Sequence, residues 1–219
     1  MNRSPRSNQL RGLYVITDSR LLHCDELLLQ GVAAAISGGA RLVQYRDKST
    51  DQQKRLRQSR ALLQLCREQQ VPLLINDDIA LAAEMGANGV HLGQDDLSLA
   101  EARALLGEQA IIGLSCYNQL HLAEQAQEAG ADYVAFGRFF SSHTKPQALS
   151  ADRALLDQAR KKIQLPMVAI GGITPQNGGA LLTAGADMLA VVHGVFAQPD
   201  IQTAAQNYRQ IFQNNEREG

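Results

Sequence analysis

The chain has 219 residues, of which 45% are hydrophobic and 20% are charged, as in an ordinary soluble globular protein. This length fits one large domain, and closed α/β barrels of this size are common. The formal net charge of -1 provides no field that would draw the chain to nucleic acid or to an anionic membrane, so we expect neither as a partner.

Short apolar runs alternate with longer helical patterns along the whole chain. The expected strands cover residues 13–17, 42–45, 73–76, 89–92, 111–115, 133–136, 167–170 and 188–192. The expected helices cover about 25–36, 51–69, 78–86, 98–106, 119–129, 151–161, 175–184 and 195–213. Four helices end in a phrase of Gly, Ala and a polar residue, which indicates one recurring turn, at 39–41, 86–88, 130–132 and 185–187.

This alternation predicts the fold class. The strands are continuous apolar runs, which is typical of a parallel sheet that is covered on both faces. Eight βα units favour closure into a (β/α)8 TIM barrel over an open doubly wound sheet. Active sites of such barrels lie at the carboxyl ends of the strands, so the polar residues that follow each apolar run form the candidate site.

The cysteines and the N-terminus indicate the setting of this domain. Cys24, Cys66 and Cys116 lie far apart without a C-x-x-C motif, which suits a reducing compartment, and we expect a cytoplasmic protein. No apolar run reaches the roughly 18 residues of a membrane-spanning helix. Residues 1–11 lack the apolar stretch of a secretory signal, and we expect them to be a flexible extension of a single domain over 1–219.

Two expected strands end in carboxylates. Asn76, Asp77 and Asp78 follow the third strand, and Asp95 and Asp96 follow the fourth. Carboxylates at one edge of a sheet repel each other unless a cation lies between them, and Mg²⁺ takes its other ligands from water and substrate phosphates. We predict that Asp77 and Asp96 bind Mg²⁺ and that Asp78 caps the next helix. A purely structural role for the segment stays open.

Basic and hydroxyl side chains follow the second and fifth strands. Gln44, Arg46 and Lys48 alternate, so they share one face if the segment is extended. Arg and Lys suit phosphate groups, although a solvated charged loop is the alternative. Ser115 could donate to a phosphate, whereas His91, within the fourth strand, is as readily a core histidine as a functional one.

The last three strands predict an anion site. Residues 137–146 carry hydroxyl groups and end near Lys145, which indicates an anion-binding loop, with a structural loop as the alternative. Gly171 and Gly172 follow the seventh strand and would let backbone N–H groups approach a ligand. His193 follows the eighth strand at an expected helix start, and these two strands form the usual phosphate site of the barrel.

Taken together, the strand-end motifs resemble those of the thiamine phosphate synthase (thiamine-phosphate pyrophosphorylase) family. The matching phrases are GLYVITD at 12–18, QYRDK at 44–48, INDD at 75–78, GVHLGQDD at 89–96, SHTK at 142–145 and AIGGIT at 169–174. The resemblance implies a transferase of thiamine biosynthesis with small-molecule substrates and a Mg²⁺ cofactor. It would join 4-amino-2-methyl-5-(diphosphooxymethyl)pyrimidine to a thiazole phosphate, simple or carboxylated, in a dissociative substitution that releases thiamine phosphate and pyrophosphate. A homo-oligomer is compatible with it.

The resemblance also assigns residues by position. The pyrimidine diphosphate contacts would be Gln44, Arg46, Lys48, Asn76, Ser115 and Lys145, of which Arg46, Lys48, Ser115 and Lys145 are the catalytic set. Tyr45 and Asp47 would be further substrate-binding residues. The Mg²⁺ ligands would be Asp77 and Asp96. The thiazole phosphate contacts would be Ser142, His143, Thr144, Gly172, Val192 and His193. The family often has Thr at the position of Ser142 and Ser at the position of His193, which leaves the identity of the second contact open.

Three alternatives stay open at this point. A thiazole tautomerase paralogue shares the barrel and part of the phosphate cradle, but it needs no diphosphate and Mg²⁺ site. A non-catalytic binder of thiamine intermediates would not need the full set of cations. A sugar-phosphate enzyme on the same barrel would not need the whole set of motifs.

Overall fold

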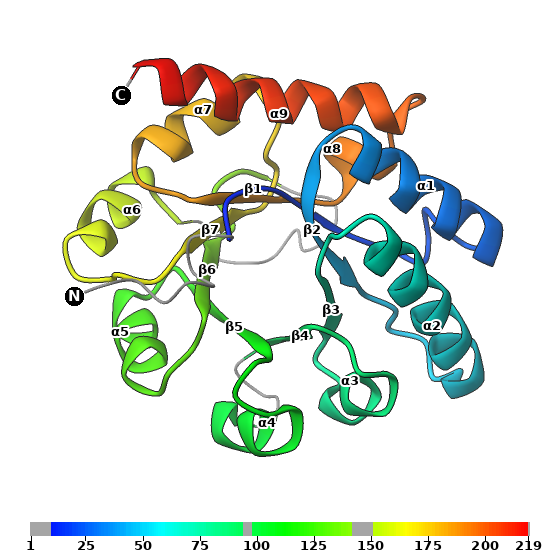
Figure 1. Cartoon of the computed structure of the whole chain (residues 1–219). Helices are drawn as coiled ribbons and strands as arrows, with labels where there is room; N and C mark the ends of the chain where they lie inside the picture. Colours follow the sequence, from blue (N-terminus) through cyan, green and yellow to red (C-terminus); the bar gives the residue numbers. More distant parts are fainter. Residues whose placement is uncertain (1–9, 94–97, 142–150, 219) are drawn as a thin grey trace.

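The computed structural model describes residues 10–93, 98–141 and 151–218. Eight parallel strands form a closed barrel in sequence order, and β8 pairs with β1 to complete it. Helices surround the strands as an outer ring (Figure 1). The predicted (β/α)8 TIM barrel is therefore confirmed.

The strands and helices alternate along the chain as the apolar pattern predicts. The strands are β1 (Gly12–Ile16), β2 (Ala40–Tyr45), β3 (Leu73–Asn76), β4 (Gly89–Leu92), β5 (Ile111–Tyr117), β6 (Tyr133–Gly137), β7 (Met167–Ile170) and β8 (Met188–Val191). The helices are α1 (Asp25–Ser37), α2 (Gln52–Glu68), α3 (Ile79–Met85), α4 (Leu99–Leu106), α5 (Leu120–Glu128), α6 (Arg153–Arg160), α7 (Pro175–Thr183), α8 (His193–Phe196) and α9 (Ile201–Glu218).

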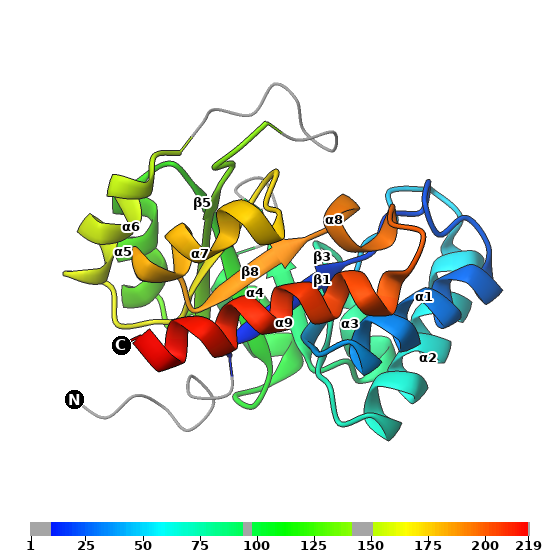
Figure 2. The ribbon, with the colours of Figure 1, turned by 90° about the horizontal axis from the view of Figure 1, so that it is seen from above.

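The last predicted helix, 195–213, is wrong as a single element, because α8 and α9 are separate. Pro199 lies between them, and proline disfavours helical backbone in the residue before it. Asp200 then starts α9, since its carboxylate accepts from the backbone N–H of Thr203 at 2.9 Å. The restarted helix runs across α1 and α7 and packs against both (Figures 1 and 2).

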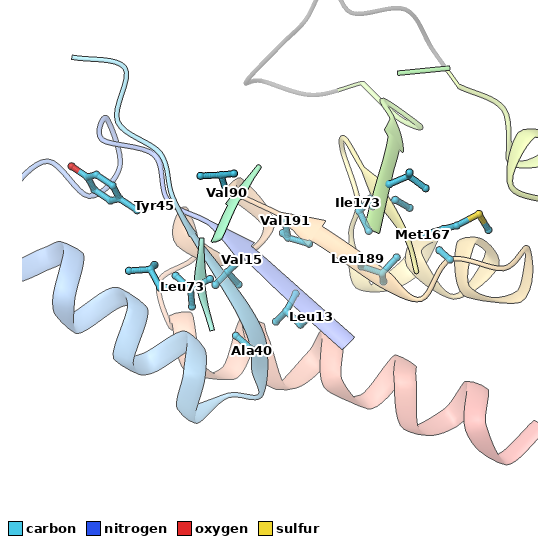
Figure 3. Packing of buried hydrophobic residues seen from close by; sticks show 14 of the residues in the cluster. Leu13, Val15, Ala40, Tyr45, Leu73, Val90, Met167, Ile173, Leu189 and Val191 are labelled. Carbon is cyan, nitrogen blue, oxygen red and sulfur yellow. The ribbon is translucent and has the colours of Figure 1, made fainter. Parts of the chain in front are cut away.

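The core has two parts because successive strand residues point to opposite faces. On β1, Leu13 and Val15 belong to the larger cluster between the strands and the helices, part of which Figure 3 shows. Tyr14 and Ile16 belong to a smaller cluster inside the barrel. Leu10 also packs in this inner cluster, although it falls within the expected extension, whose residues 1–9 lie outside the described part of the chain.

The recurring Gly-Ala phrase secures the amino-terminal end of the barrel. In three of its four copies, the third residue of the phrase accepts a hydrogen bond from a backbone N–H group at the start of the neighbouring strand: Leu73 donates to Asn88 at 2.9 Å, and Ile112 and Met167 donate to Asp132 and Asp187 at 2.8 Å. These hydrogen bonds hold the strand starts in place and stabilise the fold at the end opposite the expected site.

Two further expectations concern the setting. Within the described ranges, no helix is long and apolar enough to cross a membrane. All three cysteines are free, and Cys116 is buried.

Candidate active site

Polar side chains occupy the inner face of the barrel where β2 to β5 end. Leu42 and Leu74 lie inside the barrel, so alternation also directs Gln44 and Asn76 inward. His91 on β4 is hydrogen-bonded to Ser115 on β5 through one ring nitrogen and to the inner Tyr133 through the other. The predicted residues of four neighbouring strands therefore meet at one mouth.

A tight turn at the end of β3 presents Asp77. Its φ is 63°, a left-handed conformation that few non-glycine residues adopt, although Asp tolerates it better than most. The N–H of Asp78 donates to the carbonyl of Asn76 at 2.8 Å, and the N–H of Asp77 donates to the carbonyl of His91 at 2.9 Å. These bonds hold a strained turn in place, and strain of this kind is often found at functional sites.

Two predicted partners converge on the Asp77 carboxylate. The Asn76 amide donates to it at 2.6 Å, and the Lys48 ammonium forms an ion pair with it. The side chain of Asp77 is 26% exposed, so the carboxylate is open to the mouth. The structure thus brings together Lys48, which follows β2, with Asn76 and Asp77 at the end of β3.

The chemistry of this donor set fits Mg²⁺. In the described part of the chain there is no group of three or more His, Cys, Asp or Glu that could hold a metal, and Asp96 lies outside that part. Mg²⁺ does not require such a cage, because one or two carboxylates with water and substrate phosphates are its usual ligands. Asp77 is a carboxylate of this kind beside the cation of Lys48.

Asp78 has the structural role that the sequence predicts. Its side chain accepts from the backbone N–H of Leu81 at 2.9 Å and so caps α3. It also forms an ion pair with Arg55 of α2 at 2.7 Å. Asp78 is therefore directed at helices and not at the mouth.

The side chains of residues 44–48 do not all face the mouth. Tyr45 is buried in the outer cluster, and its hydroxyl donates to Gln58 of α2 at 2.9 Å. Asp47 is buried and pairs with Lys54 at 2.8 Å. Burial would raise the pKa of Asp47, but hydrogen bonds from Lys54 and Ser49 outweigh burial and hold the pKa below its usual value. Tyr45 and Asp47 thus fasten the loop to α2, which leaves the alternate side chains for the site.

Thr17 is a positioning residue that the sequence reasoning did not single out. Its hydroxyl accepts from the backbone N–H of Arg46 at 2.9 Å. Thr17 is buried directly after β1. This bond holds the backbone of Arg46 at the mouth, and a buried polar residue at the end of an apolar strand was the available signal.

A chain of hydrogen bonds crosses the inside of the barrel. The Gln44 amide nitrogen donates to the Tyr14 hydroxyl at 2.5 Å, and the hydroxyls of Tyr14 and Tyr133 are 3.0 Å apart. His91 Nδ1 lies 2.9 Å from the Tyr133 hydroxyl, and its Nε2 lies 2.9 Å from Ser115 Oγ. Five side chains from five strands thus form one continuous polar row, which connects two predicted site residues, Gln44 and Ser115.

The β7 and β8 side of the mouth has the predicted glycines and helix start. Gly171 and Gly172 have φ values of 103° and 63°, and a Cβ on Gly172 would lie 2.3 Å from the carbonyl oxygen of Ser141. The close approach at Gly172 is therefore to the backbone that follows β6. Val192 is the N-cap of α8, which begins at His193. The remaining predicted contacts of this side lie outside the described residues: Ser142, His143, Thr144 and Lys145.

Comparison with known proteins decides the family. Residues 13–195 match the family model described as thiamine monophosphate synthase. The chain belongs to the thiamine monophosphate synthase family. The match reaches from β1 to β8 and includes every described residue of the mouth.

Relatives and a solved structure agree with this family. The chain is 54% identical to the thiamine-phosphate synthase of Nitrosococcus oceani over 206 residues, which cover 94% of both chains. It is 54% identical to the thiamine-phosphate synthase of Marinobacter nauticus over 209 residues, which cover 94% of this chain and 93% of the relative. The structure of thiamine phosphate pyrophosphorylase from Pyrococcus furiosus superimposes with a TM-score of 0.85 at 31% identity, covering 96% of this chain and 98% of that one.

These findings confirm the resemblance on which the site prediction depends. The chain is an enzyme of the thiamine monophosphate synthase family, a transferase of thiamine biosynthesis. The roles of single residues, the metal and the order of bond breaking are the subject of the proposal that follows.

Proposed function

We propose that the mouth of the barrel joins 4-amino-2-methyl-5-(diphosphooxymethyl)pyrimidine to a thiazole phosphate and releases thiamine phosphate and pyrophosphate. The observation that carries this proposal is the convergence of Lys48, Asn76 and Asp77 at the ends of β2 and β3. A cation and a carboxylate side by side suit a diphosphate that arrives with a divalent metal.

The proposed reaction is a substitution at the methylene carbon of the pyrimidine. The bond from this carbon to the diphosphate oxygen breaks first, and its electron pair leaves with the diphosphate. The thiazole nitrogen then donates its lone pair to the carbon and forms the new C–N bond. Cys116 has no part in this chemistry as a nucleophile, because burial raises the pKa of its thiol to about 12.

The leaving diphosphate gathers negative charge, so its stabilisation is the main task of the protein. Arg46, Lys48 and Lys145 supply the cations, and Ser115 supplies a hydroxyl donor. Asp77 and Asp96 would hold Mg²⁺, which when bound neutralises part of the charge of the diphosphate. Asn76 donates to the Asp77 carboxylate and keeps it directed at the mouth.

The thiazole phosphate binds on the opposite side in this proposal. Gly172, Val192 and His193 lie where β7 and β8 end, and Ser142, His143 and Thr144 belong to the neighbouring connection. This placement puts the thiazole nitrogen across the mouth from the diphosphate. Holding both substrates in one orientation converts an encounter in solution into a reaction within one complex.

We also propose that the enzyme works in the cytoplasm on small molecules alone. Three free cysteines suit a reducing compartment. The homo-oligomer stays a prediction, and light scattering of the eluted protein would test it.

A product assay tests the proposed function. Purified protein is mixed with Mg²⁺ and both substrates, and thiamine phosphate and pyrophosphate are quantified over time. We expect equal amounts of both products, and none when either substrate is left out. The protein is also given a thiazole phosphate tautomer alone. Isomerisation of that compound without synthase products would overturn the proposal in favour of the tautomerase.

A further inference from the structure

The polar row inside the barrel has a definite direction. Tyr14 and Tyr133 are fully buried, and burial raises the pKa of both phenols far above the usual value. Each phenol therefore keeps its single proton at any physiological pH. A hydroxyl could accept from both of its partners, but its own proton would then stay unbonded in the interior, which is costly. A buried hydroxyl with two partners therefore accepts from one and donates to the other.

The donor and the acceptor of each hydrogen bond in the row can be assigned in turn, starting from Gln44. Its amide nitrogen can only donate, so the Tyr14 oxygen accepts from it and the Tyr14 proton goes to the Tyr133 oxygen. Tyr133 has accepted that bond, so its own proton goes to His91 Nδ1. His91 Nδ1 is an acceptor, so the neutral ring carries its proton on Nε2 and donates it to Ser115 Oγ.

This direction determines the role of the Ser115 hydroxyl. Its oxygen accepts from His91, so its hydroxyl proton is not used within the row. Ser115 is half-buried on β5, near the carboxyl end of the strand. The proton is therefore available to a group at the mouth, and a group that accepts it must carry lone pairs, as a phosphate oxygen does.

We propose that Tyr14, Tyr133 and His91 are positioning residues that fix Ser115 as a hydrogen-bond donor to an oxyanion of the substrate. This inference rests on the proposed function, in which the oxyanion belongs to the diphosphate of the pyrimidine. The reverse direction of the row would commit the Ser115 proton to His91 and turn only lone pairs toward the diphosphate. In a dry interior every bond of the row must reverse together, so the direction is held by all of its members.

The packing around the row keeps its rings in place. The His91 and Tyr133 rings are stacked, with centroids 5.6 Å apart and an interplanar angle of 16°. Tyr14 meets Tyr133 edge to face at 6.1 Å. Gly113 leaves room for this arrangement, because a Cβ at that position would lie 1.9 Å from Tyr133 Cζ. Rings that are locked in this way hold the nitrogen atoms of His91 in line with both partners.

The first test is spectroscopic and needs no substrate. Protein with ¹⁵N-labelled histidine is examined by NMR, and a His91→Phe variant identifies the signals of His91 among the five histidines. We expect the neutral ring with its proton on Nε2 and an unprotonated Nδ1. A neutral ring with its proton on Nδ1 would overturn the proposal.

The second test is kinetic, with Tyr133→Phe, which keeps the ring and removes the hydroxyl. We expect kcat/KM for the pyrimidine diphosphate to fall roughly tenfold, as for the loss of one oriented hydrogen bond to a charged group. The KM for the thiazole phosphate should not change. In a Ser115→Ala background the same substitution should have no further effect, because the positioned donor is already absent.

A control and the outcomes complete this test. Tyr208→Phe removes another buried hydroxyl, which donates to the carbonyl of Ile173 at 2.8 Å outside the row. Tyr208→Phe should change kcat/KM by the same factor in the parent chain and in the Ser115→Ala background. If the loss of kcat/KM caused by Tyr133→Phe also adds fully to the loss caused by Ser115→Ala, the positioning role is wrong although the synthase function stands. If the parent chain forms no thiamine phosphate, the proposed function itself fails, and the NMR result still decides the direction of the row.

Discussion

An Asp77→Asn variant should keep its fold and lose most of its turnover. Asparagine has nearly the same shape as aspartate and tolerates the φ of 63° at this turn. The ion pair with Lys48 joins side chains that are 59% and 26% exposed, and such a pair contributes at most about 1 kcal/mol to the free energy of unfolding. For a chain of this size Tm should fall by no more than about 4 °C.

The expected loss of activity is much larger than this loss of stability. Asp77 is the one proposed metal ligand in the described part of the chain, and the substitution removes its charge beside the leaving diphosphate. Removing one preorganised electrostatic contact lowers kcat about 100- to 1,000-fold, which corresponds to roughly 3–4 kcal/mol of activation free energy. A large loss of kcat with a small fall in Tm would therefore assign Asp77 a role in the reaction and not in the fold.

The neighbouring carboxylate provides the matched control. Asp78→Asn keeps a side chain that can cap α3 and loses only the charge that pairs with Arg55. Initial rates of pyrophosphate release give kcat for both variants, and thermal unfolding gives Tm. Asp78→Asn should have a kcat close to that of the parent chain. A near-normal kcat in Asp77→Asn, or an equal loss in both variants, would refute the reasoning.

Three further outcomes are expected. Lys145→Ala should lower kcat by orders of magnitude at an unchanged Tm, since it removes a cation from the leaving diphosphate; normal turnover would remove Lys145 from the catalytic set. His193→Ser should leave the KM for the thiazole phosphate nearly unchanged, because both side chains can donate to a phosphate; a complete loss of activity would assign His193 another role. The pKa of Asp47 lies below its usual value of 3.8, so its pairing with Lys54 stabilises the fold above that pH and is lost as pH falls through the folded-state pKa. Asp47→Asn should therefore show a smaller fall in Tm than the parent between about pH 5 and pH 2, and an equal fall would contradict this pairing.

The fold was predictable because its signals are local. Most strands are apolar runs with buried residues on both faces, and glycine marks the turn before several strands, as the φ of 63° at Gly86 shows. The exception is the last helix, where the apolar period continues through Pro199. The apolar period indicates which face of a helix is buried. It does not show that the helix is interrupted, which here is indicated only by a proline that lacks a backbone N–H.

The site was predictable where one strand end presents its own residues. The Asp78 cap follows directly from the residues after β3, whereas the left-handed turn at Asp77 that precedes it was not predicted. The motif at 44–48 suggested five contacts, whereas the alternation of an extended chain turns Tyr45 toward α2. A motif identifies a segment, and the backbone period decides which of its side chains reach the site.

The inner polar row could not be predicted, because it depends on neighbours that are distant in sequence. Tyr14 and Tyr133 are 119 positions apart, and His91 and Tyr133 are 42 positions apart. These pairs face each other only after the barrel has closed and its register is set. Tyrosines within apolar strands were the available signal, but packing alone explains such residues equally well.

The most direct test of metal-assisted transfer at this mouth is the rate of thiamine phosphate formation after chelation. The protein is treated with EDTA, assayed with both substrates, and assayed again after Mg²⁺ is added in excess of the chelator. The account predicts that the rate is lost and then restored, with one pyrophosphate released for each thiamine phosphate formed. An undiminished rate in EDTA would contradict it.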